Sequence, residues 1–237
     1  ARGFLWYQAE SNCGDREDPR DYQHKTTALV NGWRKTWGRD LPFYFVQLPR
    51  GERYGWSFMR DEQRRALAIP GTGMAVTIDL EFAGIHPPNK IDVGRRLARW
   101  ALAKDYGLKI PFSGPLYREH KIKNDEITVS FDHADGGLMV GKKEELQPVR
   151  ETPDAELHGF EVVGKDRKWH AAKATAEGSA VIVSSDQVPS PVAVRYACAP
   201  QPTAGKAWNL YNRAGLPASP FCSDPAYWKY DPASAGK

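Results

Sequence analysis

Two polar side chains lie at positions where a chain of alternating strands and helices commonly carries its chemistry. His86 lies between a strand-like run and a helix-like segment, and Gln8 ends a short apolar run near the N-terminus. Histidine is the commonest general base, and a primary amide can donate two hydrogen bonds to developing negative charge. The alternative for His86 is a capping role at the helix entry. The alternative for Gln8 is packing within the sheet.

A serine nucleophile to match such a base is hard to find in the chain. Ser11 lies in Ala9-Glu10-Ser11-Asn12-Cys13, which lacks both glycines of the Gly-x-Ser-x-Gly elbow. Ser11 is therefore a poor candidate for the nucleophile. The remaining histidines are better explained by surface or structural roles, and they are His24, His120, His133, His158 and His170.

The sequence carries no signature of a bound cofactor. Cys13, Cys198 and Cys222 have no Cys-x-x-Cys spacing, and the sequence has neither a glycine-rich phosphate loop nor a His-Glu-x-x-His motif. We therefore predict a protein with no metal and no other cofactor. The odd number of cysteines leaves at least one thiol unpaired within the chain. Whether Cys198 pairs with Cys222 stays open.

The composition is that of a globular protein, with 41% hydrophobic and 26% charged residues among 237. The 33 basic and 29 acidic side chains are too evenly balanced to indicate nucleic-acid binding. No apolar run approaches the roughly 20 residues of a membrane helix, and the first residues lack a signal-peptide pattern. Because the chain also begins without Met, we expect a processed or excerpted product.

The first half of the chain alternates strand-like and helix-like segments. Apolar runs predict strands near residues 3–8, 43–48 and 74–79. Apolar residues at helical spacing predict helices over residues 21–37, 57–68 and 89–107. This alternation is typical of parallel strands joined by crossover helices, and strands buried on both faces read as nearly continuous apolar runs.

The pattern changes near Pro111, where short strand-like runs separated by turn residues replace the helical stripes. Such runs occur at residues 127–131, 159–163, 180–184 and 192–196. This spacing is typical of an antiparallel sandwich or a jelly-roll-like domain. We therefore expect an α/β chain with a first domain over residues 1–112, a β-sandwich-like domain over 113–225 and a flexible tail over 226–237.

Four short stretches, in one order between residues 4 and 221, point to a known family. They are Phe4-Leu5-Trp6-Tyr7-Gln8-Ala9-Glu10-Ser11-Asn12, Pro42–Leu48, Ile85–Lys90 running into Val93–Ala98, and Asn209–Asn212 followed by Gly215–Phe221. The first is similar to the family's Trp-Tyr-Gln-Gly-Glu-Ser-Asn. Through these stretches the chain resembles the C-terminal part of the sialate O-acetylesterases, which are SGNH-type carbohydrate esterases.

The resemblance implies a partial SGNH-hydrolase domain, with three layers around a parallel sheet. It also implies a carboxylic ester hydrolase that removes O-acetyl groups from sialic acid or other acetylated glycans. A serine would attack the acetyl carbonyl, with His86 as its base and Gln8 helping to hold the oxyanion. Glu10 and Asn12 would shape the substrate pocket.

The chain departs from the family pattern at three places. The family's serine lies upstream in a Gly-Gln-Ser-Asn motif, which this sequence lacks. The family places an aspartate shortly before the histidine, whereas residues 83–85 here carry no acid, so Asp79, Glu81 or a backbone carbonyl would have to orient the imidazole. Ala9 stands where the family usually has glycine, and its methyl group would crowd the oxyanion or shift the turn.

The absence of the Gly-Gln-Ser-Asn motif has a consequence for the parallel sheet. In a doubly wound fold the central strand carries the first catalytic block, and this chain supplies only the strands beyond it. The run Phe4–Tyr7 would then expose an apolar edge, which invites pairing or aggregation. We therefore expect an N-terminal segment or a separate chain to complete the catalytic domain.

Two other functions remain open from the sequence. One is a non-catalytic carbohydrate-binding or structural protein derived from such an esterase. The other places carbohydrate recognition in the β-rich half, which carries Trp169, Trp208 and Tyr211. For the esterase hypothesis and for the sugar-binding alternatives, the expected ligand is an acetylated sugar. We expect neither nucleic acid nor a membrane as a partner. Family habit implies a secreted, periplasmic or lysosomal location.

Overall fold

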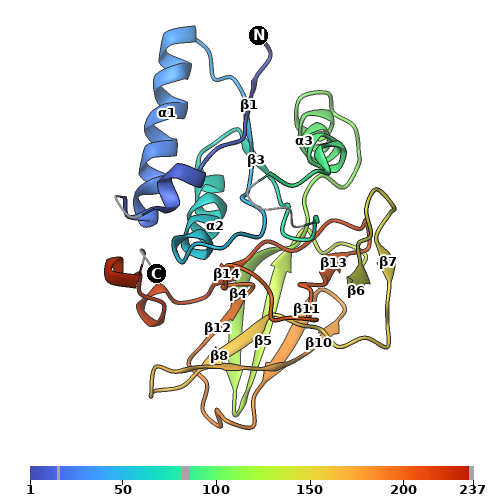
Figure 1. Cartoon of the computed structure of the whole chain (residues 1–237). Helices are drawn as coiled ribbons and strands as arrows, with labels where there is room; N and C mark the ends of the chain where they lie inside the picture. Colours follow the sequence, from blue (N-terminus) through green and yellow to red (C-terminus); the bar gives the residue numbers. More distant parts are fainter. Residues whose placement is uncertain (15–16, 82–85, 235–237) are drawn as a thin grey trace.

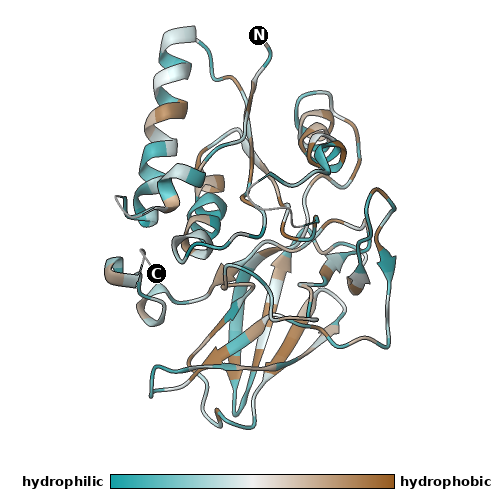
Figure 2. Cartoon of the chain, in the orientation of Figure 1, coloured by the Kyte–Doolittle hydropathy of each residue, from teal (hydrophilic) through white to brown (hydrophobic). Residues whose placement is uncertain are grey.

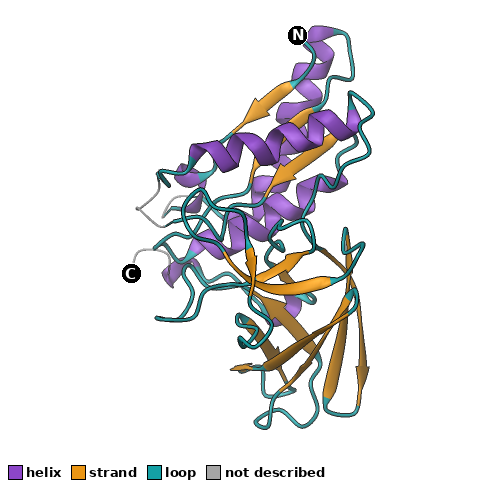
Figure 3. Cartoon of the chain, turned by 90° about the vertical axis from the view of Figure 1, so that its right-hand side faces the viewer, coloured by secondary structure: helices purple, strands orange, loops and turns teal. Residues whose placement is uncertain are grey.

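The computed structural model describes residues 1–14, 17–81 and 86–234 (Figure 1). The first half forms an α/β lobe around a parallel sheet, and the second half forms a β-rich lobe of antiparallel sheets (Figure 3). The predicted change of architecture near Pro111 is therefore confirmed at this level. The first sheet has the order β1-β2-β3, made of β1 (Phe4–Trp6), β2 (Phe43–Val46) and β3 (Thr72–Ala75).

Helices cover both faces of this sheet. They are α1 (Tyr22–Trp37), α2 (Gly55–Arg65) and α3 (Lys90–Lys104). On one face, Trp33 of α1 lies 4.7 Å from the ring of Phe4, measured between ring centroids. On the opposite face, Trp100 of α3 packs with Tyr44. The alternation of side chains along a strand explains this, because neighbouring residues of β2 point to opposite faces.

The ends of these elements follow local chemistry. Gly38 ends α1 in the left-handed conformation, with a φ of 63°. Asn89 begins α3, where its Oδ1 accepts the N–H of Asp92 at 3.0 Å. The second predicted helix is α2 followed by a 3-10 turn, and the third strand begins and ends earlier than predicted. The short 3-10 helices are η1 (Glu10–Cys13), η2 (Pro19–Asp21), η3 (Ala66–Ala68), η4 (Pro225–Tyr227) and η5 (Pro232–Ser234).

The β-rich lobe contains two four-stranded antiparallel sheets and a three-stranded one. The first has the order β10-β11-β5-β4, with β4 (Leu116–Lys123), β5 (Glu126–Asp132), β10 (Lys173–Glu177) and β11 (Ala180–Ser184). The second has the order β14-β12-β8-β9, with β8 (Phe160–Val163), β9 (Trp169–Ala171), β12 (Ala193–Tyr196) and β14 (Phe221–Cys222). The third has the order β13-β6-β7, with β6 (Leu138–Lys142), β7 (Arg150–Glu151) and β13 (Leu210–Asn212).

One apolar cluster runs through both lobes. It joins Phe43 and Met74 of the parallel sheet to Val129 and Val183 of one antiparallel sheet and Val194 of another. In the β-rich lobe, β5 accordingly alternates buried apolar with polar residues, and β11 is mostly apolar (Figure 2). Because the cluster is continuous, the two lobes share it, and two smaller apolar clusters lie within the first lobe.

The residues beyond the β-rich lobe pack on α2. The ring of Trp228 stacks on Phe58 with centroids 4.3 Å apart, and Tyr230 stacks on Tyr54 at 5.6 Å. These contacts lie in the segment for which the sequence predicted a flexible tail, and they account for the burial of Tyr230. Its last residues, 235–237, lie outside the described part of the chain.

Strand β1 has a partner on only one side within the part of the chain that the structure describes. It pairs with β2 in parallel, and Leu5 lies opposite Tyr44. Leu5 is therefore on the sheet face that α3 covers, but its side chain is 68% exposed, since α3 packs over β2 and β3. An exposed leucine on an open strand edge is a feature that proteins normally cover.

A buried arginine joins the two lobes. Arg60 of α2 is fully buried, and its guanidinium donates to the carbonyl oxygens of Ala197 and Ala199 in the β-rich lobe and of Pro49 in the first. Trp208 lies under the guanidinium, 4.9 Å from it. Burial lowers the pKa of Arg60 to about 10.

We expect Arg60→Met to lower the free energy of unfolding by about 2–6 kcal/mol, because the carbonyls of Ala197 and Ala199 lose their donor at roughly 1–3 kcal/mol each. The Pro49 carbonyl keeps the indole N–H of Trp56. Urea unfolding of the whole chain measures this. Arg39→Met, at an exposed position, is the matched control and should change stability little. A variant at position 60 as stable as the parent would show that the guanidinium adds nothing net.

Candidate active site

The turn after β1 holds the amide of Gln8 in a defined orientation. The hydroxyl of Tyr22 lies 3.0 Å from both the Gln8 backbone oxygen and its side-chain Oε1. The amide nitrogen Nε2 donates to Oδ1 of Asn12 at 2.6 Å. Because Asn12 donates through its Nδ2 to Glu17, its Oδ1 needs a donor, and this sets the orientation of the Gln8 amide. Asn12 accepts one of the two amide N–H groups, and none of the residues that the structure describes accepts the other.

A chain of hydrogen bonds extends this clamp onto α1. Asn12 donates through Nδ2 to Oε2 of Glu17 at 2.6 Å, and Lys25 donates to the same oxygen at 2.5 Å. The hydrogen bond from Lys25, followed by that from Asn12, lowers the pKa of Glu17. Burial raises the pKa of Tyr22 to about 12, so its hydroxyl keeps its proton. The amide of Gln8 is thus positioned by residues from three successive segments.

Ala9 adopts a backbone conformation that suits glycine. Its φ of 155° and ψ of −7° are rare for a residue with a side chain, and it is completely buried. Its N–H donates to Oε2 of Glu10 at 2.9 Å. With Glu10 in this position, the Ala9 N–H is occupied by a carboxylate and is not open to an oxyanion.

His86 precedes α3, and its side chain is exposed. Among residues 1–14, 17–81 and 86–234, no hydrogen bond to its imidazole is recorded. The cap of α3 is Asn89, so a capping role for His86 has no support in the contacts. At the start of α3, the Lys90 ammonium lies 5.0 Å from the ring centre of Tyr7, the residue before Gln8. The helix that follows His86 therefore begins beside the end of β1.

Of the two acids considered for orienting His86, Asp79 is committed elsewhere. Both of its carboxylate oxygens accept from the Arg96 guanidinium, at 2.6 and 2.7 Å, and the pair is buried. Arg96 also donates to the Val76 backbone at 2.7 Å, so the pair ties α3 to the end of β3. Glu81 is exposed and lies five residues before the histidine.

The sequence did not indicate Tyr22 or Arg96 as site-forming residues. Tyr22 reads as the first apolar residue of an amphipathic helix, and nothing in the sequence marks its hydroxyl. Arg96 did leave a signal, because it interrupts the apolar stripe between Val93 and Trp100, where a buried charge needs a partner. The predicted residues Gln8, Glu10 and Asn12 do meet in one turn.

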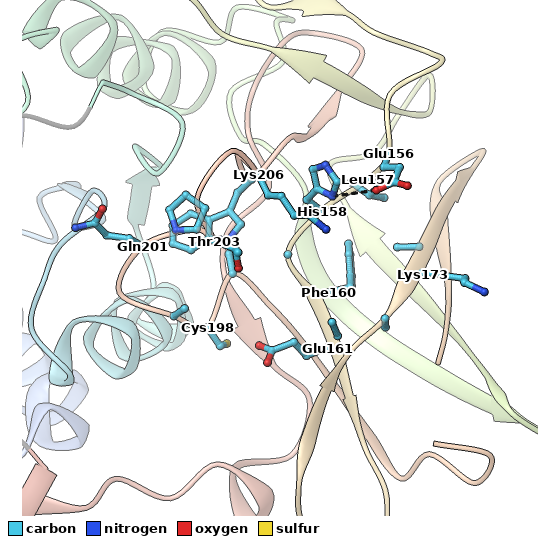
Figure 4. A pocket seen from close by; sticks show the side chains of 18 residues that line it. Glu156, Leu157, His158, Phe160, Glu161, Lys173, Cys198, Gln201, Thr203 and Lys206 are labelled. Atoms are coloured by element: carbon cyan, nitrogen blue, oxygen red, sulfur yellow. Dashed lines mark ion pairs between the residues drawn. The ribbon is translucent and has the colours of Figure 1, made fainter. Parts of the chain in front are cut away.

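Two adjoining cavities lie in the β-rich lobe and where it meets the first lobe. One of about 300 Å³ is lined by Arg50 and Asp79 beyond the parallel strands and by Glu156 and His158. The other, of about 560 Å³, shares Glu156 and His158 and opens beside Lys206 (Figure 4). The Nδ1 atom of His158 and the Glu156 carboxylate are 3.8 Å apart.

The aromatic residues that favoured a sugar-binding β-rich half are mostly packed. Tyr211 is buried, and Trp208 is only 5% exposed beneath Arg60. Trp169 donates its indole N–H to the Tyr227 backbone, and the Arg195 guanidinium covers its ring at 4.4 Å. Trp208 and Tyr211 therefore offer no open face on which a sugar could stack, and one face of the partly buried Trp169 is covered.

The described residues include no group of three or more His, Cys, Asp and Glu side chains placed to hold a metal ion. All three cysteines are buried free thiols. The disulfide between Cys198 and Cys222, which the sequence left undecided, is therefore not formed. Across the described helices, none combines the length and the hydropathy needed to span a membrane.

We expect Ala9→Gly to stabilise the chain by about 1 kcal/mol. The strained backbone of Ala9 costs on the order of 1–3 kcal/mol, and the added flexibility of glycine in the unfolded chain takes back about 0.4–1 kcal/mol. Urea unfolding measures the difference. The matched control is Ala68→Gly, at an exposed position without a positive φ, which should be neutral or destabilising. A loss of stability at position 9 would contradict the strain.

Comparison with known proteins gives consistent matches. Residues 1–103 match the family model described as "Carbohydrate esterase, sialic acid-specific acetylesterase". The mouse sialate O-acetylesterase is 29% identical over 93% of this chain and 44% of its own length. The human enzyme is 28% identical over 93% and 45%, and the rat enzyme 32% over 55% and 29%. The chain thus spans less than half the length of these curated relatives.

A solved structure extends the likeness to the fold. The crystal structure of a carbohydrate acetylesterase from Xanthomonas citri superposes with a TM-score of 0.83 and 36% identity. The match covers 94% of this chain and 50% of that one. It includes both lobes, so their arrangement is common to the two proteins. These matches confirm that the chain resembles the sialate O-acetylesterase family of carbohydrate esterases.

Proposed function

We propose that this chain is the histidine-bearing part of an SGNH-type carbohydrate O-acetylesterase. The observation that carries the proposal is the clamped amide of Gln8 at the carboxyl end of β1. Open α/β sheets bind ligands outside the carboxyl ends of their strands. A donor fixed before the substrate arrives stabilises an oxyanion without having to reorganise during the reaction.

The roles follow from the chemistry of each side chain. His86 takes the proton of a serine hydroxyl as that oxygen attacks the acetyl carbonyl, and later returns a proton to the leaving sugar oxygen. Gln8 donates its remaining amide N–H to the oxyanion. Asn12 holds that amide in place, and Glu10 borders the pocket. The exposure of His86 suits a base that must reach a group on another segment.

The serine comes from outside these residues in this proposal. Its source is an N-terminal segment, or a separate chain, that adds a strand to the free edge of β1. Three features support it: the unpaired edge, the exposed side chain of Leu5 beside it, and the span of less than half of the curated relatives. A parallel strand there would bring its carboxyl end next to Gln8.

The substrate class is an acetylated sugar, whether sialic acid or another glycan. The names of the relatives support this class, since they are a sialate O-acetylesterase and a carbohydrate acetylesterase. The competing function is a non-catalytic carbohydrate-binding protein derived from such an esterase. One observation favours it, because the Glu10 carboxylate occupies the Ala9 N–H.

We predict that the 237-residue chain alone does not hydrolyse an aryl acetate. A version extended upstream through the Gly-Gln-Ser-Asn block should hydrolyse it, and His86→Ala should abolish that activity, because the serine loses its base. His24→Ala, on α1, is the matched control and should stay active. Hydrolysis by the unextended chain would place the nucleophile within these residues, with Ser11 the first to test. An inert extended version would favour the non-catalytic function.

In the extended version, Gln8→Ala should lower kcat by about 10²–10³-fold, the usual effect of losing an oxyanion donor. Tyr22→Phe should lower kcat less, about 5–10-fold, because the amide keeps its position but loses one orienting bond. KM should change little in both. Tyr106→Phe, at an exposed tyrosine, serves as the control. Full activity of the Gln8 variant would remove the amide from the mechanism.

A further inference from the structure

A cleft of about 470 Å³ separates α3 from the β-rich lobe, and it is strongly basic. Arg95, Arg96 and Arg99 of α3 form one wall. Lys143, after β6, and Arg213, after β13, come from the other lobe. The volume lies in the usual range of ligand sites, about 300–1,000 Å³.

Three of these cations are neutralised by specific carboxylates. Arg96 is held by Asp79, as described above. The buried ammonium of Lys143 lies 2.7 Å from Asp92. Arg213 lies 2.6 Å from Glu151, which also lines the cleft. Of these pairs, the one between Lys143 and Asp92 joins the two walls, because Asp92 belongs to α3 and Lys143 to the β-rich lobe.

Within the described part of the chain, Arg95 shares the Asp92 carboxylate with Lys143, and Arg99 pairs with no carboxylate. Arg95 is 65% exposed, and its contact with the Asp92 carboxylate is long, at 3.4 Å. Arg99 donates to the backbone oxygen of Pro111 at 2.8 Å. The two are four residues apart on one helix, so their guanidinium groups lie on the same face and repel each other. A bound anion would relieve this repulsion and receive two forked donors.

Apolar side chains also line the cleft, beside the polar Gln147, and they narrow the class of anion. They are Leu146, Pro148 and Val149, together with the buried Met139 and Leu216. A small inorganic anion gains no favourable contact from apolar side chains. A sugar ring does, because its C–H groups pack on apolar surface while a carboxylate on the ring reaches the arginines.

We propose that this cleft binds a carboxylate-bearing sugar, a sialic or hexuronic acid unit, with Arg95 and Arg99 as its carboxylate clamp. At 100° per residue, both arginines lie on the side of α3 opposite Lys90, which faces Tyr7 and the candidate active site. The cleft is therefore a second site, for another unit of the glycan. That this unit belongs to the esterase substrate rests on the proposed function; the binding itself does not.

The test is calorimetric titration of the whole chain at low ionic strength with N-acetylneuraminic acid, glucuronic acid and their methyl esters. We expect saturable binding of at least one acid and at least 10-fold weaker binding of its ester, since the ester lacks the charge. Arg95→Gln/Arg99→Gln should weaken binding of that acid about 10-fold or more. Arg118→Gln/Arg167→Gln, a matched loss of two arginines outside the cleft, should leave it within about 2-fold. Arg95→Gln alone provides a milder variant if the double one unfolds.

The outcomes separate this site from the esterase proposal. Binding that persists in His86→Ala, whatever the result with aryl acetates, supports the cleft on its own. Three results would overturn it: no saturable binding of either acid, equal binding by the arginine variants, or inorganic phosphate binding as tightly as the sugar acids. The last would mean a positive surface with no sugar specificity.

Discussion

A buried cation joins the two lobes, and none of the described residues supplies it with a counter-ion. The guanidinium of Arg60 is surrounded by backbone oxygens from both lobes and by the ring of Trp208. Carbonyl oxygens carry only partial charges, so such an arrangement tolerates a buried cation only where several of them converge. The loop at residues 197–199 must therefore keep its path, and that path sets where the β-rich lobe meets α2. Neighbouring contacts depend on the same alignment, including the bond from Gln47 to the Ser219 hydroxyl at 2.9 Å.

Much of the fold was predictable because its signals are local. Periodicity in the first half gives the parallel strands and their helices, and the turn-separated runs of the second half give antiparallel sheets. The free edge at β1 follows from counting strands. What could not be predicted are the contacts between residues far apart in sequence. Arg60 and its carbonyl partner at Ala197 are 137 positions apart, and no sequence pattern pairs a side chain with a backbone oxygen.

The candidate site divides in the same way. Gln8, Glu10 and Asn12 were predicted as site residues from the resemblance to the esterase family. They lie within five residues of one another, and the turn that contains them brings them together. The spacing of residues in the sequence does not show where a carboxylate points, so it could not identify the acid that orients His86. Asp79 is near in sequence but points to Arg96, since a buried carboxylate is most stable against a bidentate guanidinium. The clamp from Tyr22 was hidden because a tyrosine at a helix start looks like any other apolar residue.

The continuous apolar cluster also constrains how this architecture can change over evolutionary time. Where two domains have separate cores, each can be exchanged, duplicated or lost as a unit. Here Met74 and Val129 belong to the same packed interior although they lie on opposite sides of the apparent boundary near Pro111. A larger side chain in the core of one lobe must be compensated by a smaller one in the other lobe, so that the packed volume stays the same. The β-rich lobe is thus inherited with its partner sheet, and gene fusions that cut near Pro111 would leave two halves, each with an exposed interior.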